Sequence, residues 1–183
     1  MTDKASTPRL PNPRRVITDT NPDTGLAGFS TAQDESLGVT NDLGGSLFRL
    51  GYVADRAPQA LDGADLAAYG DHLQTKPPLF NPGDGATVWY VDTAPGGTSP
   101  MHRTVSLDVV VLLEGEIELT LDSGEKRLLR PGDMTVQRAT MHAWRNPSAD
   151  KWARMVAVMA ESQPVKLSDG RELGTHFPPR EGK

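Results

Sequence analysis

The chain has 183 residues, of which 37% are apolar and 23% are charged, with a formal net charge of −5. This length predicts one domain, or one domain with tails, of the soluble globular class. No apolar run approaches the roughly 20 residues of a membrane span, the basic residues form no stripe that would bind nucleic acid, and the absence of cysteine excludes disulfides and thiolate metal sites.

The N-terminal part is predicted to be irregular. Residues 1–14 hold three prolines among polar residues, which predicts a disordered or loosely docked arm. No apolar segment follows its positive charge, so we expect no secretory signal and a cytoplasmic location. Residues 15–19 are predicted to form a strand that ends at a turn over 21–25. Weak periodicity and frequent glycine over 26–45 indicate a long surface connection.

The remainder of the 15–85 segment is predicted to pack strands and loops on a barrel. Residues 46–53 are apolar and aromatic, which favours a second strand. Asp62 as an N-cap and Gly70 as a stop predict a short helix between them. The prolines within 76–83 predict irregular chain, since proline removes a backbone donor and restricts its predecessor.

From residue 86 the pattern changes to short strands separated by tight turns. Strands are predicted at 87–92, 99–104, 108–113, 116–122, 134–137, 141–146 and 152–160. Such short, regularly spaced strands predict an antiparallel sandwich or small barrel over 86–163. The charged, proline-containing tail of 164–183 loses the pattern, and we expect it to wrap the surface or help pair two subunits.

Four polar residues interrupt these strands. His102, Thr104, Asp108 and His142 could all point into one barrel, because residues two apart on a strand share a face. Two imidazoles and one carboxylate are a plausible ligand set for a divalent transition metal.

The order of residues around this set resembles the first motif of the cupin family. That motif places a glycine, two histidines, a glutamate and a second glycine at fixed intervals. The matching positions, with every spacing kept, are Gly96, His102, Thr104, Asp108 and Gly115.

A second cupin motif follows. It is matched by Pro131, Gly132, His142 and Asn146, while Gln137 and Ala139 stand where proline and glycine are usual. The resemblance covers about residues 86–160 and is closest to small single-domain biosynthetic cupins of bacteria and fungi. It implies an all-β fold, an antiparallel double-stranded β-helix or jelly roll, with an irregular N-terminal extension and a short helix.

The resemblance also implies a metal site with departures. Cupin sites use three histidines and a glutamate, whereas here Thr104 replaces one histidine and Asp108 replaces the glutamate. His102, Asp108 and His142 are the expected metal ligands and catalytic residues, for zinc, iron, manganese or nickel. Three ligands with open positions are typical of catalytic sites. Alternatively, Asp108 orients His102, or the Asp–His pair is a metal-free general acid and base.

Other residues are candidates for the substrate pocket. Trp144 and Asn146 share strand parity with His142 and are expected to line the same cavity, with Thr104. Arg138 could bind a substrate carboxylate. Two further arginines, Arg103 and Arg145, have the opposite parity and are expected on the exterior or at a subunit contact. His72 and His176 are interpreted as solvated surface residues.

The function predicted from the resemblance is that of a metal-dependent lyase, a decarboxylase or dehydratase, or an isomerase. Its substrate would be a small carboxylate, carbonyl or polyketide-like molecule. Two alternatives remain, a non-haem iron dioxygenase and a non-catalytic barrel that binds a small ligand. The resemblance further suggests a homodimer, with residues 15–19 as the strand to be exchanged.

Overall fold

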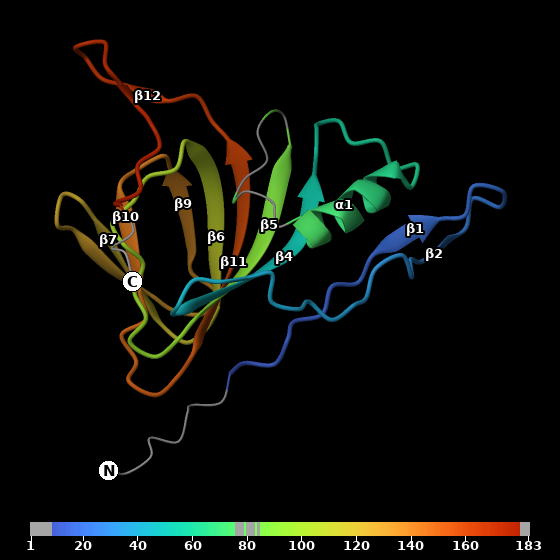
Figure 1. Ribbon diagram of the computed structural model, residues 1–183, viewed down its shortest axis with the longest axis horizontal. Coiled ribbons are helices and arrows are strands. Elements are labelled where there is room, and N and C mark those ends of the chain that lie inside the picture. The colour runs from blue at the N-terminus through green and yellow to red at the C-terminus, as the bar shows by residue number, and fades with distance from the viewer. Residues whose placement is uncertain (1–8, 76–78, 80–82, 84, 180–183) are drawn as a thin grey trace.

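The computed structural model describes residues 9–75, 79, 83 and 85–179 (Figure 1). The described residues form thirteen strands and one helix. In chain order these are β1 (Thr18–Thr20), β2 (Ala27–Phe29), β3 (Asn41–Asp42), β4 (Ser46–Ala54), α1 (Ala64–Thr75), β5 (Ala86–Thr93), β6 (Ser106–Glu114), β7 (Ile117–Leu121), β8 (Lys126–Leu129), β9 (Met134–Arg138), β10 (His142–Arg145), β11 (Ala153–Glu161), β12 (Val165–Lys166) and β13 (Glu172–Leu173).

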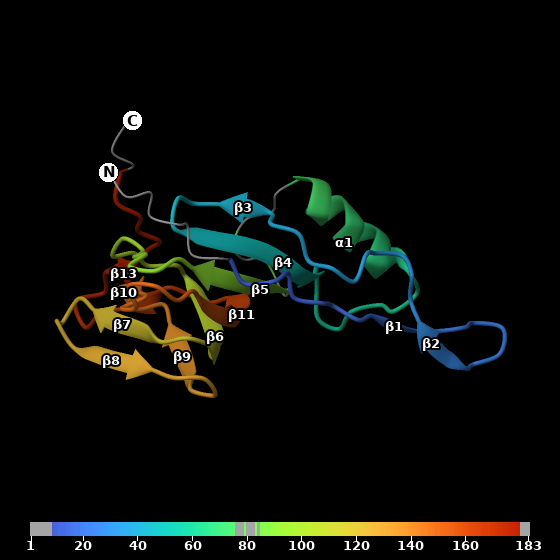
Figure 2. The ribbon, with the colours of Figure 1, turned by 90° about the horizontal axis from the view of Figure 1, so that it is seen from below.

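Two antiparallel sheets build the body of the molecule. The larger has the order β3-β4-β5-β11-β6-β9 and the smaller the order β10-β7-β8, while β1-β2 and β12-β13 are separate hairpins. In Figure 2 the smaller sheet lies across β6 and β9 of the larger one, and α1 covers the opposite end of the larger sheet. The all-β architecture expected from the short, regularly spaced strands is therefore confirmed.

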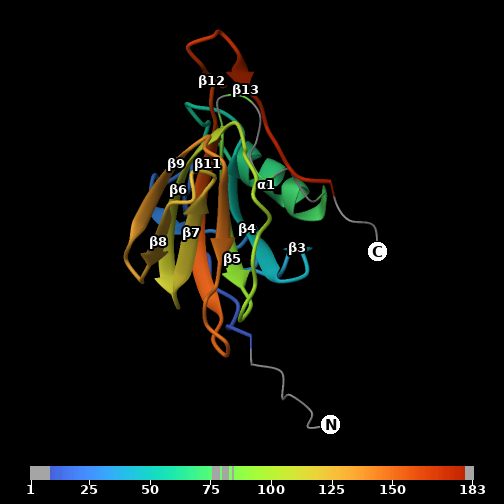
Figure 3. The same cartoon turned by 90° about the vertical axis from the view of Figure 1, so that its left-hand side faces the viewer.

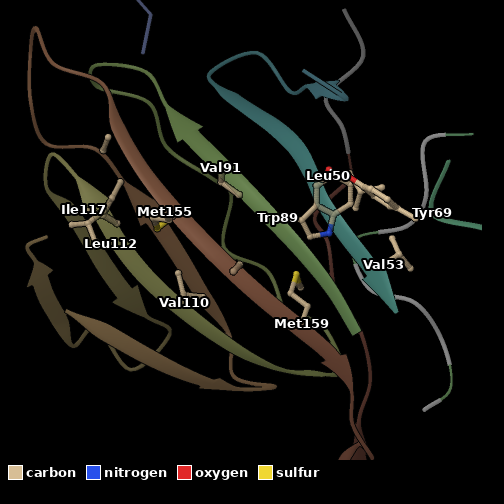
Figure 4. Close-up of a cluster of buried hydrophobic side chains, with 12 residues drawn as sticks. Leu50, Val53, Tyr69, Trp89, Val91, Val110, Leu112, Ile117, Met155 and Met159 are labelled. Carbon is tan, nitrogen blue, oxygen red and sulfur yellow. Dashed lines mark hydrogen bonds between the residues drawn. The ribbon is translucent and has the colours of Figure 1, made fainter. Parts of the chain in front are cut away.

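The core cluster extends from the space between the sheets to the contact of β4 with α1, where Tyr69 lies (Figure 4). Strand alternation explains its composition: on β5, Trp89 and Val91 are buried while Val88 and Tyr90 between them are more exposed. The inward side chains that form the core cluster are Leu50, Val53, Tyr69, Trp89, Val91, Val110, Leu112, Ile117, Ala153, Met155, Ala157 and Met159.

The helix is longer than the sequence indicated. Its start is as expected, since Asp62 Oδ1 accepts a hydrogen bond from the Ala64 amide (3.1 Å). Gly70, however, does not end it, and α1 continues to Thr75. A Cβ at position 70 would lie only 2.7 Å from Gln33 Nε2, so this glycine serves the close packing of the 26–45 connection rather than a helix stop.

Two further predictions in the N-terminal half need correction. The first strand spans Thr18–Thr20 rather than 15–19, and it pairs with β2 as a small hairpin. The connection over 26–45 also contains β2 and β3, so it is only partly irregular. Except for Leu79 and Gly83, the irregular stretch predicted at 76–83 lies outside the described residues.

A buried charge cluster docks part of the arm. Asp92 Oδ2 accepts a hydrogen bond from Arg49 Nη1 (2.6 Å), and Asp92 Oδ1 accepts one from Arg154 Nε (2.6 Å). Arg154 Nη2 also donates to the carbonyl of Pro11 (2.8 Å), and Arg49 Nε donates to Asn12 Oδ1 (3.3 Å). The described end of the predicted arm is thus tied to the barrel by hydrogen bonds to both buried guanidinium groups.

In the second half most predicted strands form, with two differences. Residues 99–104 are not a regular strand, because Pro100 cannot donate to a ladder; this segment makes only isolated pairings. Strand β8, between the two predicted turns, was not anticipated. Within the described ranges there is no helix long and apolar enough to cross a membrane.

Candidate functional site

The two histidines are brought together by backbone pairing. The His102 amide donates to the His142 carbonyl and the His142 amide donates to the His102 carbonyl, each at 2.9 Å. Gly96 makes this possible, since its φ of 68° lets the chain turn after β5 and run antiparallel to β10. The segment around His102 therefore extends the smaller sheet beyond its edge strand β10.

The two imidazole rings lie close together. Their centroids are 4.3 Å apart, and the rings are tilted by 47°. His102 Nδ1 lies 2.8 Å from the Pro100 carbonyl, and because a carbonyl oxygen only accepts hydrogen bonds, this contact assigns the proton of His102 to Nδ1 and leaves its Nε2 with a lone pair. His142 Nδ1 lies 2.9 Å from both the Thr140 carbonyl, an acceptor, and the Gln137 Nε2 amide, a donor, so its contacts are compatible with either tautomer.

Burial keeps both rings neutral. It lowers the pKa of His142 to about 4, with a smaller lowering from His102 and an opposing effect of the Thr140 carbonyl. Burial also lowers the pKa of His102, against the Pro100 carbonyl, which raises it. At neutral pH the pair consists of two uncharged imidazoles.

Asp108 lies on β6 of the larger sheet, and one of its carboxyl oxygens has no hydrogen-bond donor among the described residues. The residue is 5% exposed, and the oxygen without a donor there is Oδ1. Burial raises the pKa of this carboxyl to about 6, although the Ser106 hydroxyl acts to lower it. Asp108 is thus a carboxyl that can gain or lose a proton near neutral pH.

Gln137 is a buried residue that contacts His142, and the sequence did not identify it as a site residue. It is the direct cross-strand partner of Asp108 in the β6–β9 pairing and is 3% exposed. Its Nε2 lies 3.0 Å from the Thr140 carbonyl and 2.9 Å from His142 Nδ1. The parity of β9, with Val136 and Arg138 exposed on either side, is the signal that points Gln137 inward.

Thr104 and Ser106 add two buried hydroxyl groups. The Ser106 hydroxyl donates to Thr104 Oγ1 (2.7 Å), and Ser106 and Thr104 are 0% and 4% exposed, respectively. The predicted inward position of Thr104 agrees with this burial. Thr104 thus accepts a hydrogen bond from the residue that also lowers the pKa of Asp108.

The three predicted metal ligands do not form one group. Within the part of the chain that the structure describes, no three His, Cys, Asp or Glu side chains are close enough together to hold an ion. His102 and His142 offer two nitrogen donors, but protein metal sites use at least three ligands. Asp108 is one methylene shorter than the glutamate usual in the motif, and the side chain that contacts His142 is that of Gln137, the register partner of Asp108. The residues therefore do not fit a resident metal in this arrangement.

The other predicted pocket residues have mixed outcomes. Trp144 meets His142 edge to face, with ring centroids 5.5 Å apart, as its parity suggested. Asn146 is fully buried in a structural role, since its Nδ2 donates to the carbonyls of Thr93 (3.0 Å) and Lys151 (2.7 Å). Arg138 is exposed on the outer face of β9 and does not reach the site, because Gln137 takes the inward position.

The remaining histidines and arginines also differ from one another. His72 is not simply solvated, as its Nε2 lies 2.9 Å from Asp55 Oδ1. His176 is exposed, as expected, but its backbone pairs with that of Arg103. Arg103 and Arg145 lie opposite in parity to the histidines, and Arg103 lines a surface cavity of about 460 Å³ together with the tail. Arg145 is exposed beside Glu118.

The tail supplies a further ring that the sequence did not indicate. Phe177 stacks on His102 with ring centroids 5.2 Å apart and planes inclined by 19°. The tail has no periodic pattern, so nothing in residues 164–183 alone points to this contact.

Comparisons with known proteins identify the family of the chain. The family model described as Cupin domain matches residues 89–159. Phomopsin biosynthesis cluster protein D of Diaporthe leptostromiformis is 44% identical over 168 residues, which cover 91% of this chain and 87% of that protein. A cupin-domain-containing oxidoreductase of Neurospora crassa is 37% identical over 168 residues, with 91% and 82% covered.

Among solved structures, the chain is similar to the polyketide cyclase RemF from Streptomyces resistomycificus. The matched region covers 67% of this chain and 72% of the RemF chain, with 16% identity and a TM-score of 0.46. The family assignment rests on the two fungal relatives and on the matched domain, whose range includes Gly96, His102 and His142. The chain therefore belongs to the cupin family.

Proposed function

We propose that this cupin is a small-molecule enzyme that moves protons at a carbonyl or carboxylate substrate, as a lyase or isomerase. A decarboxylase or dehydratase falls within this class. The observation that supports it is the combination of two neutral imidazoles, paired at 4.3 Å, with a facing carboxyl whose pKa is about 6. Groups with such separated proton affinities can take different roles at one pH.

Asp108 is the proton carrier in this proposal. Its pKa of about 6 lies near the working pH, which maximises the use of one group first as acid and then as base. Its buried Oδ1 has no hydrogen-bond partner among the described residues, so it would accept a hydrogen bond from a substrate that enters beside it. Gln137 positions His142 and occupies the register position opposite Asp108.

His102 and His142 hold the substrate in this proposal. The His102 Nδ1–H is directed to the Pro100 carbonyl, so its Nε2 accepts a hydrogen bond from a substrate hydroxyl or enol. The neutral His142 beside it offers its Nε2 as an acceptor or a donor, according to its tautomer. The low pKa of His142 keeps it uncharged when such a group donates to it. A hydroxylated or enolisable carbonyl compound is the class that presents these donors.

Oxidoreductase activity is the second candidate, because the relative from Neurospora crassa with 37% identity carries that description. Two histidines would also bind iron, but a third ligand would have to come from a movement of Asp108 or from the substrate. Oxygen consumption by iron-loaded protein, measured beside an anaerobic sample, separates this activity from proton transfer. Ligand binding without turnover under either condition would favour the non-catalytic barrel.

Solvent exchange tests the proposed function across a range of candidate substrates. A panel of β-hydroxy carboxylates, β-keto acids and hydroxylated aromatic carbonyl compounds is incubated with protein in deuterium oxide. Deuterium incorporation and product formation are followed by nuclear magnetic resonance. Asp108→Asn should lower the rate on any active compound by about 100-fold or more, while Asp122→Asn, at an exposed hairpin carboxylate, should not change it.

Two outcomes oppose the proposal. Exchange or product formation that persists unchanged in Asp108→Asn would remove the assigned proton carrier. No activity of the wild-type chain on any member of the panel, together with oxygen uptake on the same compounds, would favour the oxidoreductase.

A further inference from the structure

The C-terminal tail forms part of the same sheet as the two histidines. The Arg103 amide donates to the His176 carbonyl and the His176 amide donates to the Arg103 carbonyl, both at 2.8 Å. His102, next to Arg103, is in turn paired with His142. Figures 1 and 2 show the tail returning from β12 and β13 to pass beside β10. Three chain segments therefore lie side by side, with the His102 segment in the middle.

This register places Phe177 on the same face as the imidazoles. With Arg103 opposite His176, the antiparallel order sets Phe177 opposite His102. The rings of Trp144, His142, His102 and Phe177 follow one another, with successive centroid distances of 5.5, 4.3 and 5.2 Å. The last pair is nearly parallel, at 19°. The series forms an aromatic wall that ends at the tail.

The tail is held loosely where it carries this ring. Besides the two bonds to Arg103, the Val105 amide donates to Thr175 Oγ1 at 3.3 Å. The side chain of Phe177 remains 48% exposed, and residues 174–179 are all exposed, so little apolar burial fixes them. Figure 3 shows this stretch leaving the β12–β13 hairpin as an extended segment without helix or strand, along one side of the molecule. It can move without disturbing the core.

We propose that Phe177 is a substrate-positioning residue, which lifts from His102 with the tail and closes on a planar conjugated carbonyl compound seated against that imidazole. This inference rests on the proposed function, because it names the substrate class of the same site. A half-exposed phenylalanine lying parallel to a histidine offers a flat surface, and flat conjugated molecules gain the most from it. Saturated, puckered molecules of equal charge gain only the area that they cover.

The tail could instead be a simple cover, with Phe177 only anchoring it. An anchor and a positioning residue differ in one measurable property, the preference between planar and puckered ligands. Loss of an anchor would weaken all ligands alike, whereas loss of a stacking surface would weaken the planar ligand specifically.

Ligand binding to the full-length chain tests the inference by titration calorimetry. The probes are cinnamate, which is planar and conjugated, and 3-cyclohexylpropanoate, its saturated counterpart with the same charge. The wild-type chain should bind cinnamate about 3- to 10-fold more tightly than the saturated acid. Phe177→Ala should reduce that ratio to about one, and Phe177→Trp should restore it. Phe29→Ala, at a 76% exposed ring in the β1–β2 hairpin, is the matched control and should leave the ratio unchanged.

Three results would overturn the inference: a cinnamate preference that survives Phe177→Ala, an equal loss for both acids, or no binding of cinnamate by the wild-type chain. Binding is measured without turnover, so its outcome is separate from that of the proposed function. If Asp108→Asn keeps the planar preference and no exchange reaction is found for the wild type, the stacking site stands and the proton-transfer proposal falls.

Discussion

Substitution of Asp108 by asparagine should make the stability of this protein fall steeply on acidification. In the wild type, burial raises the pKa of Asp108 from 3.8 to about 6 and lowers that of His142 from 6.5 to about 4. Below pH 6 the folded protein gains a proton at Asp108 that the unfolded chain does not yet bind, so stability rises. Below pH 6.5 the unfolded chain binds a proton at His142 that the folded protein does not bind until about pH 4, so stability falls.

The two effects are similar in size and opposite in sign. At about 1.4 kcal/mol per pH unit for one proton, each interval of somewhat over two units corresponds to about 3 kcal/mol. Between pH 6 and 4 the wild-type contributions of Asp108 and His142 therefore nearly cancel. Asp108→Asn removes the stabilising half, because an amide does not titrate. Its free energy of unfolding should drop by about 3 kcal/mol more than that of the wild type between pH 7 and pH 4.

Urea denaturation at pH 7, 5.5 and 4 measures this difference, followed by tryptophan fluorescence. The contributions of all groups that titrate alike in both proteins cancel in the comparison. As a control, the pH dependence of the unfolding free energy of Asp122→Asn, at an exposed position, should parallel that of the wild type. Parallel curves for Asp108→Asn and the wild type would refute the reasoning. Such a result would mean that the folded and unfolded chains bind the Asp108 proton alike, and hence that burial does not raise the pKa of this carboxyl.

Three further predictions concern the rest of the molecule. Asp92→Asn leaves Arg49 and Arg154 buried without a counter-charge and should lower the free energy of unfolding by about 3–5 kcal/mol; a loss below about 1 kcal/mol in urea denaturation would contradict this. Protein purified without a histidine tag should lose divalent metal on dialysis against a chelator, since fewer than three ligands are grouped among the described residues; one metal per chain retained after dialysis, and lost in Asp108→Asn, would show that Asp108 joins the histidines. The expected homodimer should dissociate in Val136→Lys, because this 51% exposed residue lies on the open apolar face of the larger sheet; sedimentation of the wild type as a monomer would count against the homodimer.

Short-range patterns account for the parts of the fold that the sequence predicted well. The alternation of polar and apolar residues over 116–122 predicted β7, which spans Ile117–Leu121. An alternation with a period of two residues is typical of a strand with one solvent-exposed face and one packed face. The turn before β10 was harder. Ala139 has a φ of 49°, a conformation unusual for a residue with a Cβ, at a position where the motif usually has glycine. The positive φ explains why the motif usually has glycine here, although the sequence alone predicted nothing about the backbone at Ala139.

The sequence predicted which site residues point into the barrel, but not which of their side chains contact one another. Parity alone placed Asp108 and His142 inside, and both are buried. Whether they meet depends on the pairing of β6 with β9 and on side-chain length, and neither can be read from local sequence. Gln137 therefore escaped notice, although it is the register partner of Asp108 and contacts His142. Phe177 lies 75 positions from its partner His102, in a tail without periodicity, so only the folded chain reveals the contact.

The distribution of satisfied and unsatisfied groups ties these features to function. Burying polar groups is costly unless each finds a partner, and in this site the Thr104, Ser106, Gln137 and His142 side chains all have one. Two buried atoms in this region, Asp108 Oδ1 and Arg103 Nε, have no partner among the described residues. A buried acceptor left without a donor costs about 1–3 kcal/mol, and a ligand that donates to it recovers this free energy. At Asp108 this unmet acceptor coincides with the atom where the proposed reaction needs a donor, which is the arrangement expected if Asp108 meets substrate rather than protein.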